Sequence, residues 1–156
     1  MNIFGIGPAL ALTGLGGFAL FFALDSVFGI KLALHGVPRA IALTIGLALA
    51  LRGIYFWAAS IIQIARGSHK NKLLAAGVYS LTRNPMYAAF IVFLVPAIAL
   101  TVNNLLFLIV PALMYQVFKR KIILEEEFLL KTFGGEYKHY CERTPRLLPG
   151  FSRRRK

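Results

Sequence analysis

The stretch that decides the fold is AIALTIGLALALRGIYFWAASIIQIA, residues Ala40–Ala65, in which Arg52 is the only charged side chain. A helix needs about 20 apolar residues to cross a bilayer core roughly 30 Å thick, so we expect this stretch to span a membrane. Arg52 near its centre would cost roughly 2.5–3.5 kcal/mol without a partner or water, so we expect it to face the bundle interior. There it could hold an anionic headgroup, pair with Asp25 or snorkel.

Three further apolar runs, Ile3–Leu24, Pro85–Thr101 and Leu105–Phe118, resemble the first in length or composition. The whole chain is 58% hydrophobic and 15% charged, whereas soluble domains are about 25% charged. We therefore predict a single all-α integral membrane domain over residues 1–156, with about four transmembrane helices near 3–24, 40–65, 85–101 and 105–121. The first run is expected to be retained, because it lacks the basic start of a signal peptide.

Asparagine, proline and glycine residues mark turns, kinks and ends within these apolar runs. Asn103 and Asn104 predict a tight hairpin between the third and fourth helices, and Pro96 and Pro111 predict kinks within them. The fourth helix is expected to leave the membrane and to end at Gly134-Gly135. The glycines of the first run favour close helix packing over a phosphate-binding loop, because no strand precedes them.

The basic residues are unevenly distributed along the chain, whose formal net charge is +12. Most lie after Phe118, without the aromatic interleaving of a nucleic-acid module, so we expect contact with membrane lipids and no nucleic-acid partner. The positive-inside rule then places both termini, and the segments 66–84 and 119–149, on the cytoplasmic side. The short chain with bare ends is typical of a prokaryotic inner or plasma membrane protein.

The acidic residues are few, six in the chain, and three of them are consecutive: Glu125, Glu126 and Glu127. Only one or two can face the same way on a helix, so the third is expected to be solvated or paired with Lys121. An inward glutamate would favour a cation. Cys141 is the only cysteine, which excludes an intramolecular disulfide and a cysteine-based zinc site.

The segment Leu81–Tyr87 supplies the complementary charge. Asn84-Pro85 reads as a helix start, with asparagine as the N-cap and proline at the first helical position. Arg83 and this helix N-terminus both attract anions. A zwitterion would satisfy the arginine and a glutamate together, and the amino-acid moiety of S-adenosylmethionine has that charge pattern.

The pieces Gly77-Val78-Tyr79-Ser80, Arg83-Asn84-Pro85-Met86-Tyr87, Glu125-Glu126, Phe133-Gly134-x-Glu136-Tyr137-x-x-Tyr140 and Pro145 to Pro149 occur in this order. Together they resemble the isoprenylcysteine carboxyl methyltransferase and phospholipid methyltransferase superfamily. The resemblance covers about half of the chain, from Lys72 to Pro149. It implies an integral membrane enzyme that uses S-adenosylmethionine to methylate a lipophilic acceptor.

The resemblance also implies roles for particular residues. The cofactor contacts fall at Asn71, Lys72, Leu73, Leu74, Tyr79, Asn84, Pro85, Met86, Tyr87 and Glu125, and the catalytic set is Arg83, Glu125 and Glu126. Three positions depart from the family pattern: Asn84 replaces a frequent histidine, Ala89 replaces a glycine, and Lys121 stands nearest to a substrate-contacting arginine. Lys121, Arg120 and Arg52 are the candidate substrate-binding residues.

The acceptor is left open by the sequence. An isoprenylcysteine-type carboxylate or a related small hydrophobic acid or thiol is one class, and a phospholipid amine, which must first lose a proton, is another. The alternative to an enzyme is a non-catalytic helical membrane protein such as a small transporter. Among the tyrosines, Tyr79 and Tyr87 are expected to be functional, whereas Tyr137 and Tyr140 are expected to be structural.

Overall fold

The computed structural model describes residues 6–67 and 73–148, and this part of the chain is all helical. The long helices are α1 (Gly7–Phe28), α2 (Gly36–Gly67) and α6 (Ile109–Arg143). A fourth rod is formed by three consecutive helices: α4 (Pro85–Ala88), the π-helix η1 (Ala89–Leu94) and α5 (Val95–Thr101). Two short helices, α3 (Val78–Leu81) and the 3₁₀ helix η2 (Leu105–Leu108), lie between the rods in the sequence. The all-helical prediction is confirmed.

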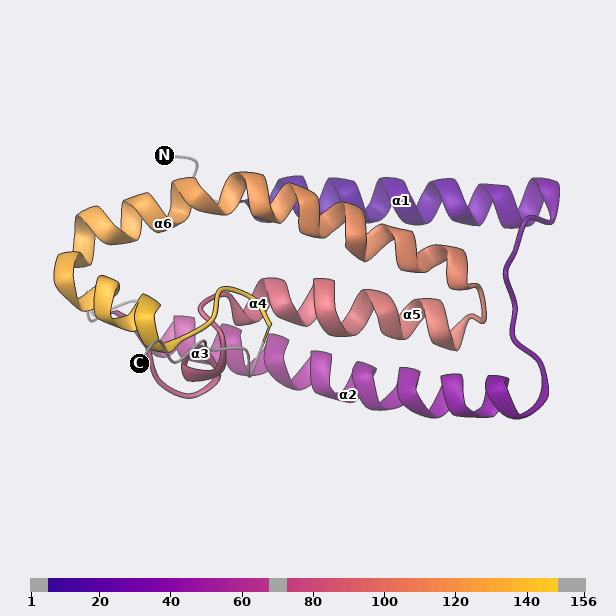
Figure 1. Cartoon of the computed structure of the whole chain (residues 1–156), viewed down its shortest axis with the longest axis horizontal. Helices are drawn as coiled ribbons and strands as arrows, with labels where there is room; N and C mark the ends of the chain where they lie inside the picture. The colour runs from indigo at the N-terminus through magenta and orange to yellow at the C-terminus, as the bar shows by residue number, and fades with distance from the viewer. Residues whose placement is uncertain (1–5, 68–72, 149–156) are drawn as a thin grey trace.

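The four long rods lie lengthwise beside one another (Figure 1). Helix α2 packs on the α4–η1–α5 rod, and α1 packs on α6. The bend of α6 and the short helices α3 and α4 lie at one end of the bundle, whereas the α1–α2 connection and the α5–η2 turn lie at the other. The described parts of the two segments expected to carry the chemistry, 66–67 with 73–84 and 119–148, therefore meet at one end of the bundle.

Two of the four expected spans meet a length and hydropathy criterion for crossing a membrane: Gly7–Phe28 and Gly36–Arg66. The apolar helix Pro85–Thr101 is shorter, and four crossings are not confirmed by this criterion. Many large apolar side chains of α1 and α2 are exposed, for example Leu12, Leu51 and Ile54. An apolar surface of this extent fits contact with lipid better than contact with water.

Two asparagines stabilise the end of the bundle that lies opposite to the bend of α6. Asn103 accepts a hydrogen bond from the Leu34 amide and donates one to the Leu34 carbonyl, both at 3.0 Å. Asn104 caps η2 by accepting from the Leu106 amide, and its side-chain NH₂ donates to the Asp25 carboxylate. The predicted hairpin at these residues is confirmed, and it also fastens the α1–α2 connection.

The helix that begins at Ile109 breaks at Gly134, whose φ of 54° and ψ of −124° are not helical, so the expected stop at Gly134-Gly135 is confirmed. A second helical part of α6 follows this bend and runs to Arg143. A side chain at Gly134 would be strained, because L-residues rarely adopt a positive φ. Beyond the bend the helix turns back toward α3 and α4 (Figure 1).

Arg52 does not face the bundle interior, and that expectation was wrong. It is exposed on α2, with its guanidinium carbon 6.0 Å from the Phe56 ring centre and 5.7 Å from that of Phe93. The packed side of α2 is formed by small or apolar residues such as Gly53 and Phe56, which leave no room for an arginine. Cation–π contact stabilises it at the surface instead.

The approach of α2 to the η1 segment predicts a test of packing. A Cβ atom added at Gly53 would lie 2.7 Å from Leu94 Cγ and 3.0 Å from Phe93 Cβ, whereas one added at Gly16 meets nothing within 4 Å. Overpacking costs typically 1–3 kcal/mol, and alanine regains about 1 kcal/mol of helix propensity. Gly53→Ala should therefore lower the thermal midpoint in detergent, while Gly16→Ala should leave it equal or higher. Equal midpoints for the two variants would contradict this packing.

Candidate functional site

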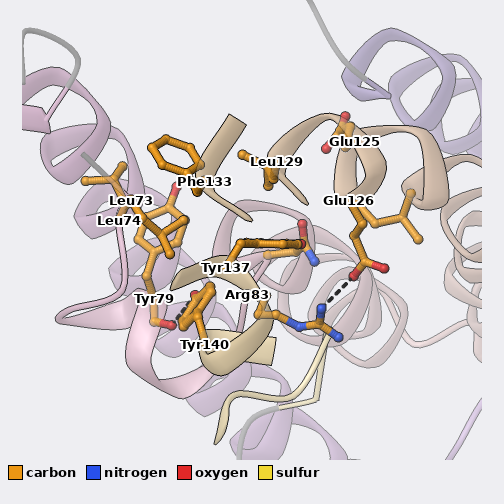
Figure 2. A pocket seen from close by; sticks show the side chains of 12 residues that line it. Leu73, Leu74, Tyr79, Arg83, Glu125, Glu126, Leu129, Phe133, Tyr137 and Tyr140 are labelled. Atoms are coloured by element: carbon orange, nitrogen blue, oxygen red, sulfur yellow. Dashed lines mark hydrogen bonds and ion pairs between the residues drawn. The ribbon is translucent and has the colours of Figure 1, made fainter. Parts of the chain in front are cut away.

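A cavity of about 260 Å³ lies where α3, the start of α4 and both parts of α6 meet. Its wall combines charged, amide, phenolic and apolar side chains: Leu73, Leu74, Tyr79, Arg83, Asn84, Ile122, Glu125, Glu126, Leu129, Phe133, Tyr137 and Tyr140. Figure 2 shows Glu126 facing Arg83, with Tyr137 and Tyr140 between this pair and Tyr79. We call it the polar cavity.

Arg83 is fixed by its backbone and by its side chain. Its amide donates to the Pro145 carbonyl at 2.9 Å, so the segment after α6 pairs with the loop before α4. The guanidinium lies 3.0 Å from Glu126 and donates to Cys141 Sγ at 2.7 Å, and the side chain is only 13% exposed. Within the described part of the chain, its buried Nε has no hydrogen-bond partner. One donor of this arginine is therefore left for a ligand or a water molecule.

Glu126 lies between two guanidinium groups. Arg83 contacts its Oε1, and Arg146 donates from Nε to Oε1 at 2.9 Å and from Nη2 to Oε2 at 2.5 Å. Two parallel bonds of this kind give the planar, bidentate geometry in which arginine binds carboxylates most strongly. Glu126 is thus charge-neutralised and joins three segments. Arg146 was not singled out from the sequence, where it is one basic residue among many in the tail.

Glu125, one position earlier, has different partners. Its Oε1 accepts from the Ile6 amide at 2.7 Å and from the Tyr87 hydroxyl at 3.0 Å. These donors are neutral, and within the described residues Glu125 forms no ion pair, not even with Lys121 four positions earlier. Glu127 is exposed, as expected for a solvated third glutamate. Glu125 is therefore the carboxylate whose negative charge is left for a cation.

The tyrosines of the polar cavity are protonated donors. Burial raises the pKa of the Tyr79 hydroxyl to about 12, and burial also raises the pKa of Tyr137 and Tyr140. The Tyr140 hydroxyl donates to the Tyr79 carbonyl, which fastens α6 beyond its bend to α3. Tyr140 thus has the structural role expected for it, and both Tyr137 and Tyr140 also line the cavity, as Tyr79 does. The signal available in the sequence was the three-residue spacing between these two tyrosines, which follow Gly134-Gly135.

The helix start at Asn84-Pro85 is observed, but its expected cap is not. Pro85 occupies the first position of α4, as predicted, and Asn84 precedes it without a side-chain capping bond. The Asn84 amide NH₂ instead donates to the Arg146 carbonyl at 2.8 Å, and Thr82 Oγ1 donates to the same carbonyl. The asparagine binds the segment after α6 because that segment lies against this loop.

Met86 and Tyr87 line a second cavity. It measures about 540 Å³ and lies between α1, α2, the α4–α5 rod and α6, with Gly7, Ala11, Gly14, Phe18, Leu94 and Met114 among its almost entirely apolar walls. We call it the apolar cavity. The two cavities share no lining residue.

The remaining candidates are placed as follows. Leu73, Leu74, Tyr79 and Asn84 line the polar cavity, while Pro85 is buried beside it. Asn71 and Lys72 lie outside the described residues. The candidate substrate-binding residues Arg120, Lys121 and Arg52 are exposed and line neither cavity. Lys121 and Arg120 point away because Ile122 and Glu125 occupy the inner side of α6.

The unequal surroundings of the three glutamates predict unequal effects on stability. Glu126→Ala would leave the Arg83 guanidinium, only 13% exposed, without its carboxylate. Removing one partner of such a pair costs about 3 kcal/mol, so the variant should unfold at a markedly lower temperature. Glu127→Ala is the matched control and should stay within about 0.5 kcal/mol of the wild type. Equal losses would show that the Arg83–Glu126 contact does not hold the fold.

Comparison with known proteins agrees with these features. A family model described as phospholipid methyltransferase matches residues 39–136. The chain is 30% identical over 89 residues to protein-S-isoprenylcysteine O-methyltransferase B of Arabidopsis thaliana, a match that covers 57% of this chain and 45% of that protein. It is 28% identical over 87 residues to protein-S-isoprenylcysteine O-methyltransferase of Schizosaccharomyces pombe, covering 55% of this chain and 37% of the relative.

A probable protein-S-isoprenylcysteine O-methyltransferase of Oryza sativa subsp. indica is 32% identical over 80 residues, which cover 51% of this chain and 42% of that protein. The matched part is thus less than half of each curated relative's length. No solved structure matches the chain significantly. Since the family model spans more than half of the sequence and includes both the Arg83 loop and the Glu125-Glu126 pair, the chain belongs to the phospholipid methyltransferase family.

Proposed function

We propose that this chain transfers a methyl group from S-adenosylmethionine to a lipophilic acceptor at the cytoplasmic face of a membrane. The observation that carries the proposal is a polar cavity beside a larger apolar one, in which Glu125 has no ion-pair partner and Arg83 Nε no hydrogen-bond partner among the described residues. A zwitterionic cofactor suits the first cavity and a lipid suits the second. The printed names of the relatives, which describe isoprenylcysteine O-methyltransferases, support the same reaction class.

The residues of the polar cavity fit one end of the cofactor. A 150 Å³ cavity holds benzene, so about 260 Å³ holds roughly ten non-hydrogen atoms, which matches the methionine end of S-adenosylmethionine. Glu125 would attract its ammonium or sulfonium charge, and the free Nε–H of Arg83 would donate to its carboxylate. The rings of Tyr79 and Tyr137 add the electron-rich faces that favour a sulfonium cation.

The bound cofactor supplies an electrophilic methyl group, which the acceptor takes by direct displacement. The chain's own residues then have two tasks, to align the reactants and to exclude water. Arg83, fixed through Glu126 and Pro145, orients one reactant, and the bend at Gly134 folds Tyr137 and Tyr140 over the cavity. Because an acceptor carboxylate is already nucleophilic, no side chain has to remove a proton from it.

We favour a carboxylate of the isoprenylcysteine type, or a related small hydrophobic acid, over a phospholipid amine. An amine acceptor is protonated at neutral pH and needs a base. Glu126 is unsuited to that task because it binds Arg83 and Arg146, and the cavity tyrosines stay protonated because burial raises the pKa of Tyr79 to about 12. A carboxylate acceptor avoids this requirement.

The membrane placement belongs to the same proposal. The four rods would cross the bilayer in the order α1, α2, α4–α5 and the first part of α6, with both termini cytoplasmic. The site end of the bundle carries Arg66, Arg120, Lys121 and Arg146, which suit the anionic cytoplasmic leaflet.

Cofactor binding tests the proposal directly. Purified protein should bind S-adenosylmethionine saturably in calorimetry, and Glu125→Ala and Arg83→Ala should each weaken binding at least tenfold, because each removes a charge-assisted contact of about 1.5–3 kcal/mol. Glu127→Ala, which changes an exposed neighbour, should bind normally. Absence of saturable binding, or binding that survives both variants, would favour the non-catalytic alternative.

The acceptor is tested by following a labelled methyl group. Protein in nanodiscs is incubated with radiolabelled S-adenosylmethionine and either N-acetyl-S-farnesylcysteine or a total phospholipid extract. We expect base-labile methyl ester label in the first and little label in the second, because only the carboxylate needs no deprotonation. Label in phosphatidylethanolamine alone would replace our acceptor with the phospholipid amine.

A further inference from the structure

The two cavities are separate, although methyl transfer requires their contents to meet. Reacting atoms must approach to roughly 3–3.5 Å. The polar and apolar cavities share no lining residue, and their linings are in contact where Tyr87 Oη lies 3.0 Å from Glu125 Oε1. Within the described residues, the hydrogen bond from Tyr87 Oη to Glu125 is the side-chain hydrogen bond that joins one lining to the other.

This hydrogen bond lies where the linings of the two cavities meet. Tyr87 belongs to the lining of the apolar cavity and Glu125 to that of the polar cavity, and the hydroxyl reaches both carboxylate oxygens, at 3.0 and 3.4 Å. The Tyr87 ring rests edge-on against Phe118, with 5.8 Å between ring centres. Rotation of this one side chain would separate the hydroxyl from Glu125.

The volume of the apolar cavity indicates which ligand would reach the Tyr87–Glu125 hydrogen bond. Scaled from benzene in 150 Å³, a cavity of about 540 Å³ holds roughly 20 carbon atoms of a single lipid chain. A chain of that length fills the cavity, so its polar end meets the Tyr87 side of the lining, whereas a chain half as long leaves about half of the cavity unfilled. Burial of the chain can supply about 0.8 kcal/mol per CH₂ toward opening.

We propose that the Tyr87–Glu125 hydrogen bond is a gate between the two cavities, which one long lipid chain of the acceptor opens by filling the apolar cavity. Tyr87 is then a positioning residue that selects acceptors by chain length. The inference deepens the proposed function and rests on it for its catalytic meaning. The gate itself concerns lipid binding and can be tested without the reaction.

The test measures binding of two unreactive alcohols, geranylgeraniol and the half-length geraniol, to the protein in nanodiscs by tritiated-ligand competition. In the wild type, the chain of geranylgeraniol fills the cavity, and its hydroxyl end meets the Tyr87–Glu125 hydrogen bond, which has to break before that end can pass toward the polar cavity. Tyr87→Phe removes that bond and keeps the ring on Phe118, so geranylgeraniol should bind about tenfold more tightly. Geraniol affinity should stay within about twofold.

Tyr115→Phe is the matched control, because Tyr115 also stacks near Phe118, with 6.4 Å between ring centres, but lines neither cavity. It should change neither affinity. Glu125→Gln weakens the same bond by removing its charge and should tighten geranylgeraniol binding in the same direction, by less. This second variant decides the question if Tyr87→Phe does not fold.

Three results would overturn the gate: no saturable geranylgeraniol binding to the wild type, equal effects of Tyr87→Phe on both alcohols, or no tightening in either gate variant. Binding of S-adenosylhomocysteine is measured in parallel on the same samples. Absence of that binding in the wild type counts against the proposed methyl transfer, whereas unchanged alcohol selectivity in the gate variants counts against the gate.

Discussion

The carboxylate of Glu126, held between Arg83 and Arg146, is the interaction on which the site depends. It joins α6 to the loop before α4 and to the segment after α6. The backbone bond from Arg83 to Pro145 and the bond from Tyr140 to Tyr79 act at the same junction. Thr82 and Asn84 add hydrogen bonds to the Arg146 carbonyl, so polar contacts from three segments hold the second part of α6 over the cavity.

The adjacent residues Glu125 and Glu126 have different roles. Positions 125 and 126 differ by about 100° around α6, so their carboxylates face different neighbours. Glu126 meets two guanidinium groups and is committed to structure, while Glu125 meets an amide and a phenol and keeps its charge for a ligand. Glu127 turns outward. A cationic cofactor would therefore find one negative charge rather than three, and a cavity otherwise near neutrality.

The bend at Gly134 and the small residues of α1 have complementary roles. The bend returns Tyr137 and Tyr140 to the polar cavity, and Gly7, Ala11 and Gly14 leave space for the apolar one. The two spaces end on either side of Tyr87 and Glu125. A membrane enzyme that takes one reactant from water and the other from lipid needs such a boundary. When only one reactant is bound, the boundary keeps water out of the lipid cavity and lipid out of the polar cavity.

Much of this protein could be predicted from the order of its residues alone. Apolar run lengths determined the helices, Asn103-Asn104 determined the hairpin, and the Arg83 to Tyr87 and Glu125-Glu126 motifs determined the family, because these properties depend on neighbours along the chain. Only the tertiary structure decided that Arg52 lies outside, that Arg146 binds Glu126 and that Tyr137 and Tyr140 line the site. Those outcomes depend on how α6 bends at Gly134 and on which faces of the helices meet. Both are decided by contacts between residues 20 or more positions apart, such as Arg146 and Glu126, which local sequence patterns do not reveal.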